Sequence, residues 1–173
     1  MAHFPSLSSP EIQEKLSKIK LLICDVDGVL TNGCVTWIKD QGWTRTFNVK
    51  DGYGLKRAQA SGVKIALITA GSSQDVKERA TLLNVDYFYS GTEDKITQYE
   101  KLMKETGLKD EEVAYIADDL FDIPILERVG LAVTVPTAVN EVKAIVHYIV
   151  QLPGGTGATR ELTDALVNRS PRI

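Results

Sequence analysis

Short apolar runs alternate with longer amphipathic segments along this chain, and this alternation is the feature that most constrains its fold. The apolar runs have the length of strands and occupy residues 20–26, 64–69, 113–117 and 131–135. Strands that are apolar on both faces are typical of a parallel sheet with helices on both sides. The sequence therefore predicts an α/β fold with a doubly wound, Rossmann-like parallel sheet.

Helical spacing of apolar residues is found between these runs. The helices predicted in this way occupy residues 53–60, 73–83, 95–106, 120–128 and 138–150. A first helix is expected to begin after Ser9, because serine is a favoured N-cap and Pro10 is a favoured first helical residue.

A chain of 173 residues fits one domain, 1–173, with a single core. We expect residues 1–18 to form an N-terminal extension with a helix. Two β-rich runs with a polar turn between them predict a β-hairpin over residues 34–49, inserted after the first strand. Glycines open the tail, 153–173, and a short helix is expected over residues 159–167.

The charge balance and the cysteine and histidine positions exclude several classes of protein. Twenty basic against 23 acidic residues argue against nucleic acid as a partner, and no apolar run approaches the ~20 residues that span a membrane. The N-terminal residues lack the pattern of a secretory leader, and Cys24 and Cys34 are expected to be free thiols, so we expect a cytoplasmic protein. Scattered histidines exclude the usual zinc sites and leave oxygen ligands for any metal.

Polar side chains follow three of the predicted strands. Asp25 and Asp27 come directly after the first strand, where ligands bind in open α/β sheets, although this pair alone fits a solvated turn equally well. Thr69 and Ala70 precede a helix whose N-terminus could bind an anion, the alternative being an ordinary N-cap. Lys95 opens a helix, a position that the helix dipole disfavours for a cation, and a surface lysine is the alternative.

A cluster of acids follows the strand at residues 113–117. Asp118, Asp119 and Asp122 can act as capping residues, but three carboxylates this close repel one another unless a cation holds them.

These motifs, in this order, resemble the haloacid dehalogenase superfamily of phosphotransferases. The matching segments are DVDGVLT at residues 25–31, LIT at 67–69, Lys95, and ADDLFD at 117–122. The segments FNVKDGYGLK, VDYFYSG, EEVAYIADDLFD and GGTGATREL extend the resemblance to the 3-deoxy-D-manno-octulosonate (KDO) 8-phosphate phosphatases of that superfamily. The likeness covers residues from about 18 to 168 and implies a member without a large cap.

The resemblance implies a role for each matching position. Asp25 would be the nucleophile and Asp27 the general acid and base. Mg²⁺ would be held by Asp25, Asp118 and the backbone carbonyl of Asp27. The Thr69 side chain, the Ala70 N–H group and Lys95 would bind the phosphoryl group, while Asp119 and Asp122 would orient Lys95 or the metal-bound waters.

The same resemblance implies how the sugar is covered. Hairpins would meet in a homotetramer, so that neighbouring subunits wall the site, and Trp37, Trp43 and Phe47 would serve that contact unless they pack on their own subunit. Arg160 is a candidate ligand of the substrate carboxylate, with a plain surface arginine as the alternative. Gly71 departs from the arginine that is typical of this group, which leaves Arg79 as a further candidate ligand.

The expected function is therefore Mg²⁺-dependent hydrolysis of a sugar-acid phosphate in lipopolysaccharide synthesis. KDO 8-phosphate is the leading candidate substrate. The alternatives are a phosphatase for a nine-carbon ulosonic acid 9-phosphate and a non-catalytic oligomerisation domain.

Overall fold

The computed structural model describes residues 6–169 and shows a central parallel sheet. Residues 1–5 and 170–173, which the expected extension and tail include, lie outside the described residues. The strand order is β5-β4-β1-β6-β7-β8. The strands are β1 (Leu21–Cys24), β4 (Lys64–Thr69), β5 (Tyr87–Ser90), β6 (Val113–Ile116), β7 (Leu131–Thr134) and β8 (Tyr148–Ile149). The predicted doubly wound α/β fold is confirmed.

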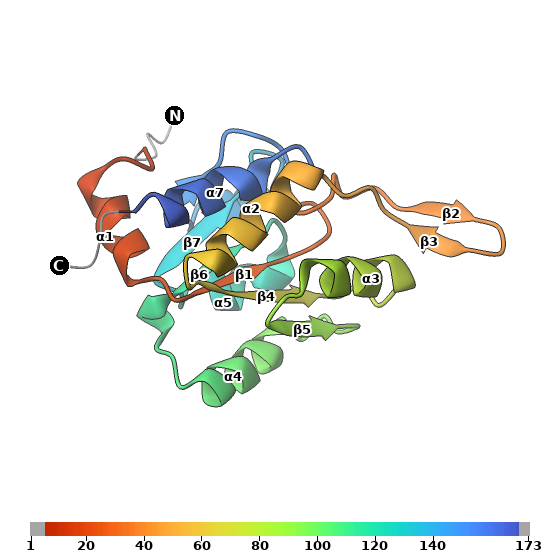
Figure 1. Ribbon diagram of the computed structural model, residues 1–173, viewed down its shortest axis with the longest axis horizontal. Helices are drawn as coiled ribbons and strands as arrows, with labels where there is room; N and C mark the ends of the chain where they lie inside the picture. Colours follow the sequence, from red (N-terminus) through yellow and green to blue (C-terminus); the bar gives the residue numbers. More distant parts are fainter. Residues whose placement is uncertain (1–5, 170–173) are drawn as a thin grey trace.

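Helices cover both faces of this sheet, with α2 and α7 packed together on one side and α4 on the other (Figure 1). The longer helices are α1 (Pro10–Lys18), α2 (Val49–Ala60), α3 (Gln74–Leu83), α4 (Lys95–Thr106) and α7 (Ala158–Val167). The short ones are α5 (Ile123–Leu126), α6 (Asn140–Lys143) and the 3-10 turns η1 (Asp110–Glu112) and η2 (Leu120–Asp122). Ser9 caps α1 as expected, because its Oγ accepts the Ile12 N–H.

Strand β1 lies at the centre of the sheet because all four of its side chains are apolar and buried. It pairs in parallel with β4 on one side and β6 on the other, so that Cys24 lies opposite both Leu67 and Ile116. The segments that follow these three strands therefore emerge side by side at one edge of the sheet.

The predicted helix over residues 138–150 is wrong. Helix α6 ends at Lys143, and β8 then pairs with β7 at the edge of the sheet. Residues 146–150 alternate between buried and half-buried positions, which is the period of a strand and not of a helix. Pairing with β7 and burial of one face therefore favour a strand over a helix at residues 146–150.

Two other elements differ from the prediction. The helix expected over residues 120–128 divides into η2 and α5, with Pro124 in the first turn of α5, where a missing N–H is tolerated. Strand β5 was not predicted, because its aromatic side chains are only half-buried on the outer edge beside β4.

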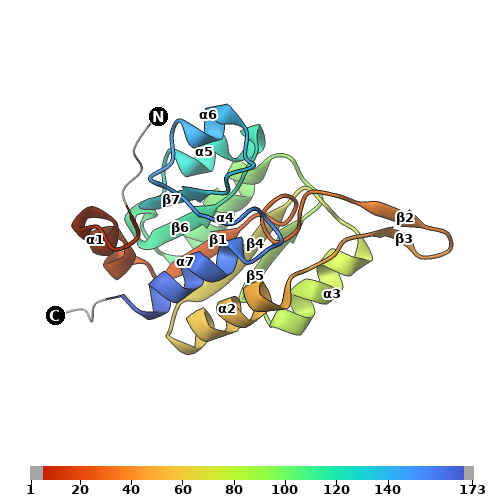
Figure 2. The same ribbon diagram turned by 90° about the horizontal axis from the view of Figure 1, so that it is seen from above.

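The predicted hairpin is present and projects away from the body of the molecule (Figures 1 and 2). Strands β2 (Thr36–Ile38) and β3 (Gly42–Thr44) pair antiparallel, with Trp37 opposite Trp43. The two indole rings meet edge to face at 5.2 Å and remain 60% and 51% exposed. Phe47, by contrast, packs against the core of its own chain.

None of the helices within residues 6–169 is long and apolar enough to cross a membrane.

Candidate active site

A cavity of about 210 Å³ lies where β1, β4 and β6 end. Because these strands are neighbours and parallel, the residues that follow them meet at one edge of the sheet. The lining residues are Asp25, Asp27, Gly28, Gly33, Thr69, Ala70, Lys95, Asp118, Asp119 and Phe121. The cavity therefore contains most of the side chains that the sequence singled out.

Asp25 and Lys95 form a buried ion pair in this cavity. The Lys95 ammonium lies 2.9 Å from Asp25 Oδ1, and the two side chains are 3% and 6% exposed. Lys95 is thus not a surface lysine, which removes that alternative. Burial raises the pKa of Asp25 to about 8, although the charge of Lys95 opposes this shift. A carboxylate in this environment is easily protonated until a cation stabilises its charge.

Asp122 holds Lys95 from the other side. Its Oδ1 accepts a hydrogen bond from the Lys95 ammonium at 2.7 Å and another from the Tyr115 hydroxyl. Burial lowers the pKa of Lys95, but its ion pairs with Asp25 and Asp122 outweigh this and raise it. Asp119, in contrast, accepts the Leu120 N–H at 2.7 Å and has no bond to Lys95. Of the two expected orienting residues, only Asp122 contacts the lysine.

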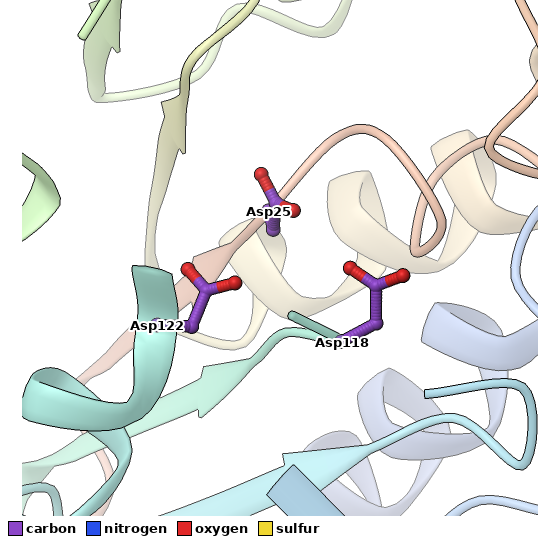
Figure 3. Close-up of side chains that lie close together, drawn as sticks. All are labelled: Asp25, Asp118 and Asp122. Atoms are coloured by element: carbon purple, nitrogen blue, oxygen red, sulfur yellow. The ribbon is translucent and has the colours of Figure 1, made fainter. Parts of the chain in front are cut away.

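Three carboxylates, those of Asp25, Asp118 and Asp122, offer oxygens that all lie within 4.8 Å of one another (Figure 3). Burial and the negative charges of Asp122 and Asp119 raise the pKa of Asp118 to about 6. Gly28 makes room for this side chain, because a Cβ at Gly28 would lie 1.9 Å from Asp118 Oδ2. Both oxygens of Asp122 accept hydrogen bonds from the protein, which leaves Asp25 and Asp118 as the carboxylates that fit a hard cation such as Mg²⁺.

The opposite side of the cavity offers hydrogen-bond donors. Thr69 is 1% exposed, and its Oγ1 accepts the Gly71 N–H at 3.1 Å, which directs the hydroxyl proton elsewhere. Ala70 also lines the cavity. Together with the Lys95 ammonium, these groups can bind the oxygens of a tetrahedral anion.

Arg45 was missed in the sequence. It follows β3, and its guanidinium contacts both oxygens of Asp27, with Nε at 2.5 Å from Oδ1 and Nη2 at 2.9 Å from Oδ2. No sequence signal marks this contact, because it depends on how the hairpin returns to the sheet. Asp27 therefore enters the cavity with a fixed cationic partner.

The structure does not bring Arg79 or Arg160 into the cavity of their own chain. The Arg79 guanidinium stacks 5.3 Å from the Phe47 ring and donates to the Asn48 carbonyl at 3.0 Å. Arg160 stacks 5.2 Å from the Tyr53 ring. A role for either arginine toward a substrate remains a prediction.

Asp51 is a second residue that the sequence did not reveal. This buried carboxylate of α2 accepts the backbone N–H groups of Gly157 at 3.2 Å and Arg160 at 2.8 Å, at the start of α7. Just before α7, Gly154 packs so closely on the loop after β1 that a Cβ would lie 1.8 Å from the Gly28 carbonyl oxygen. Asp51 thereby fixes a tail segment that supports the loop after Asp25.

Comparisons with known proteins agree with this geometry. A model of the haloacid dehalogenase-like hydrolases matches residues 87–157. The 3-deoxy-D-manno-octulosonate 8-phosphate phosphatase of Salmonella typhimurium is 36% identical over 159 residues, which cover 92% of this chain and 85% of that relative. The crystal structure of the enzyme of the same name from Yersinia pestis superposes with a TM-score of 0.87 at 36% identity, covering 91% of this chain and 85% of that one. The Moraxella catarrhalis phosphatase, in complex with magnesium, phosphate and KDO, has a TM-score of 0.89 at 35% identity and covers 92% of each chain.

Proposed function

Because the chain belongs to the haloacid dehalogenase-like hydrolases, we propose that it is a Mg²⁺-dependent phosphatase that hydrolyses KDO 8-phosphate to KDO and phosphate, a step toward lipopolysaccharide. The observation that carries this proposal is the buried Asp25–Lys95 pair beside Asp118, in a cavity that also offers anion-binding groups. The relatives at 36% identity over most of the chain supply the substrate. A non-catalytic domain has no use for such costly buried charges.

The first half of the reaction transfers the phosphoryl group to the protein. An oxygen of Asp25 attacks phosphorus, and the bond between phosphorus and the sugar oxygen breaks. Asp27 gives its proton to the departing oxygen, so that the sugar leaves as a neutral alcohol. Thr69, Ala70 and Lys95 hold the remaining phosphoryl oxygens and offset their charge.

The second half returns Asp25 to its free form. Asp27, now ionised, accepts a proton from a water molecule while the water oxygen attacks phosphorus. The bond between phosphorus and Asp25 breaks, inorganic phosphate leaves, and Asp27 again carries a proton. Asp122 keeps Lys95 beside Asp25 through both halves.

Asp25, Asp118 and the backbone carbonyl of Asp27 would hold Mg²⁺, which offsets the repulsion between the phosphate dianion and the carboxylates. The fit rests on Asp25 and Asp118, whose raised pKa values mark two carboxylates that lack a sufficient cationic partner.

The cavity is smaller than a typical ligand pocket, about 210 Å³ against ~300–1,000 Å³. It suits a phosphoryl group and a cation, so the sugar must extend beyond the rim. We propose that a homotetramer supplies the missing wall, because the projecting hairpin exposes Trp37 and Trp43 instead of packing them on its own chain. Exposed aromatic pairs of this kind are typical of protein interfaces.

Light scattering after size exclusion tests the assembly. We expect the wild type to have the mass of four chains and the Trp37→Ser/Trp43→Ser variant to have the mass of one. Leu82→Ser removes a residue of α3 that is 65% exposed and serves as the matched control, which should keep the wild-type mass. A hairpin variant that remains tetrameric would contradict this part of the proposal.

We also place the reaction in the cytoplasm. Cys24 is buried and Cys34 is exposed, and both are free thiols, which persist in a reducing compartment.

Phosphate release with and without Mg²⁺ tests the activity itself. We expect the kcat/KM for KDO 8-phosphate to exceed that for hexose phosphates and for a nine-carbon ulosonic acid 9-phosphate, with no release by Asp25→Asn. A preference for the nine-carbon acid phosphate would change the assigned substrate but leave the proposed phosphatase mechanism in place. No release from any of these substrates in the presence of Mg²⁺ would overturn the proposed function.

A further inference from the structure

Arg45 has an unusual environment for a residue at the base of an exposed hairpin. Its side chain is only 7% exposed, whereas most of the hairpin is open to solvent. The hairpin returns to the body beside α3 (Figures 1 and 2), and Arg45 enters the gap between that helix and the loop after β1. Burying an arginine is costly unless its donors are paired, so its contacts must be specific.

Every nitrogen of the Arg45 guanidinium has a partner. Nε and Nη2 contact the two oxygens of Asp27, while Nη1 donates to Ser73 Oγ at 2.6 Å and lies 3.4 Å from Asp75 Oδ1. Ser73 in turn donates to Asp75 Oδ1 at 2.6 Å. The planar guanidinium is therefore anchored to the start of α3 on one side and to Asp27 on the other.

Gly71 provides the space for this arrangement. A Cβ at Gly71 would lie 3.0 Å from Arg45 Nη2 and 3.4 Å from Asp27 Oδ2. A side chain at position 71 would thus crowd the Arg45 guanidinium, whereas its distance from Asp27 would be an ordinary contact. Gly71, which replaces the arginine typical of this family, therefore leaves room for the Arg45 guanidinium to approach Asp27.

Asp27 needs such an anchor. Its side chain is 36% exposed on a loop, and Arg45 is the one side chain within residues 6–169 that hydrogen-bonds to its carboxylate. A half-exposed aspartate can otherwise rotate away from the cavity. The two-pronged contact fixes the plane of the carboxylate and still leaves a lone pair on each oxygen.

We propose that Arg45 is a positioning residue that holds the Asp27 carboxylate at the place where the sugar oxygen leaves. This inference rests on the proposed function, in which Asp27 gives its proton to that oxygen. Arg45 acts through Asp27 and does not itself bind the sugar or the phosphoryl group. Within the transfer of the phosphoryl group to Asp25, its contribution is therefore confined to leaving groups that need a proton.

The nature of the leaving group separates this role from others. A sugar alkoxide must be protonated as it departs, whereas p-nitrophenolate departs without a proton. The kcat/KM covers the steps up to transfer of the phosphoryl group to Asp25, before the water reaction begins. Loss of a positioned acid should therefore lower kcat/KM for the sugar phosphate and spare that for p-nitrophenyl phosphate.

The experiment compares Arg45→Met, Arg45→Lys and the wild type on KDO 8-phosphate and p-nitrophenyl phosphate with Mg²⁺ present. We expect Arg45→Met to lower kcat/KM for the sugar about 100-fold, through kcat and not KM, since a positioned general acid contributes ~10²–10⁴-fold. The kcat/KM for the aryl phosphate should change less than about 3-fold, and Arg45→Lys should recover part of the loss. Arg57→Met, in α2 and paired with Asp164 of α7, is the matched control, which should keep wild-type rates for both substrates.

Each other outcome overturns the inference. Equal losses on both substrates would show that Arg45 supports the whole site structurally, and a raised KM with unchanged kcat would show that it binds the sugar. Unchanged rates would show that Asp27 needs no anchor. If the wild type hydrolyses the aryl phosphate but no sugar phosphate, the proposed function fails, and this inference fails with it. That result is seen in the wild type, whereas a failure of this inference alone is seen only when Arg45→Met is compared with an active wild type.

Discussion

Magnesium should bind about 100-fold more tightly at pH 8 than at pH 6, because its carboxylate ligands must lose protons first. In the metal-free protein, burial raises the pKa of Asp25 to about 8, and burial with neighbouring negative charge raises that of Asp118 to about 6. Both carboxylates must be ionised to hold the cation. Raising the pH across this window is therefore the perturbation that shows how the site is built.

The magnitude follows from the two pKa values. At pH 6 the ionised fractions are about 1 in 100 for Asp25 and about 1 in 2 for Asp118, and at pH 8 they are about 1 in 2 and about 1. The product rises about 100-fold, which corresponds to about 2.7 kcal/mol of binding free energy. At pH 7 the binding of one cation should release about one proton, almost all of it from Asp25.

Isothermal titration calorimetry with Mg²⁺ measures both quantities. Titrations at pH 6, 7 and 8 give the affinity, and a pair of buffers with different heats of ionisation at pH 7 gives the number of protons released. Asp118→Asn should lose the high-affinity site. Asp119→Asn is the matched control, because its side chain caps η2 and is no ligand, and it should keep the proton release from Asp25.

An affinity that changes less than about 3-fold between pH 6 and 8, with no proton release, would refute this reasoning. It would mean that Asp25 is ionised before the metal arrives and that Lys95 alone stabilises its charge.

Three further variants test the contacts around the site. Asp25→Asn should make the metal-free protein more stable than the wild type at pH 9 in urea unfolding. The raised pKa of Asp25 contributes stability that is fully present below its unfolded pKa of ~4 and is lost as the pH rises through about 8. Equal free energies of unfolding at pH 9 would refute this cause. Lys95→Met should lower the free energy of unfolding by about 3–5 kcal/mol because it leaves buried carboxylates without their cation, and Lys95→Met/Asp122→Asn should recover part of the loss. Asp51→Ala should cost about 1–3 kcal/mol, measured as a lower urea midpoint, because it leaves the N–H groups at the start of α7 unpaired; an unchanged midpoint would show that water replaces the carboxylate.

The sequence was sufficient to place the main chemical groups. Strands that are apolar on both faces predict a parallel sheet. Parallel strands that end side by side then bring Asp25, Thr69 and Asp118 together. Lys95 was noticed because a cation at the start of a helix is unfavourable unless something else stabilises it. These inferences need only the length and apolar pattern of each element.

Secondary structure was predicted less well at the edges of the sheet. Strands β5 and β8 were missed because edge strands are short and half-buried, and their pattern carries less information than that of a central strand. For residues 138–150, the apolar positions fit a helix in isolation, and the neighbouring β7 decided in favour of a strand.

By itself, the sequence determined the α/β sheet, the hairpin after the first strand and the identity of the groups at the strand ends, because these depend on local spacing. The tertiary structure decided which charges meet: Arg45 reaches Asp27 across 18 residues, and Arg79 and Arg160 turn toward aromatic rings instead of the cavity. The physical reason is that a long side chain on a loop can reach many partners. The hydrogen bond of Arg45 to Ser73 at the start of α3, and the packing of α7 against α2, select one of them.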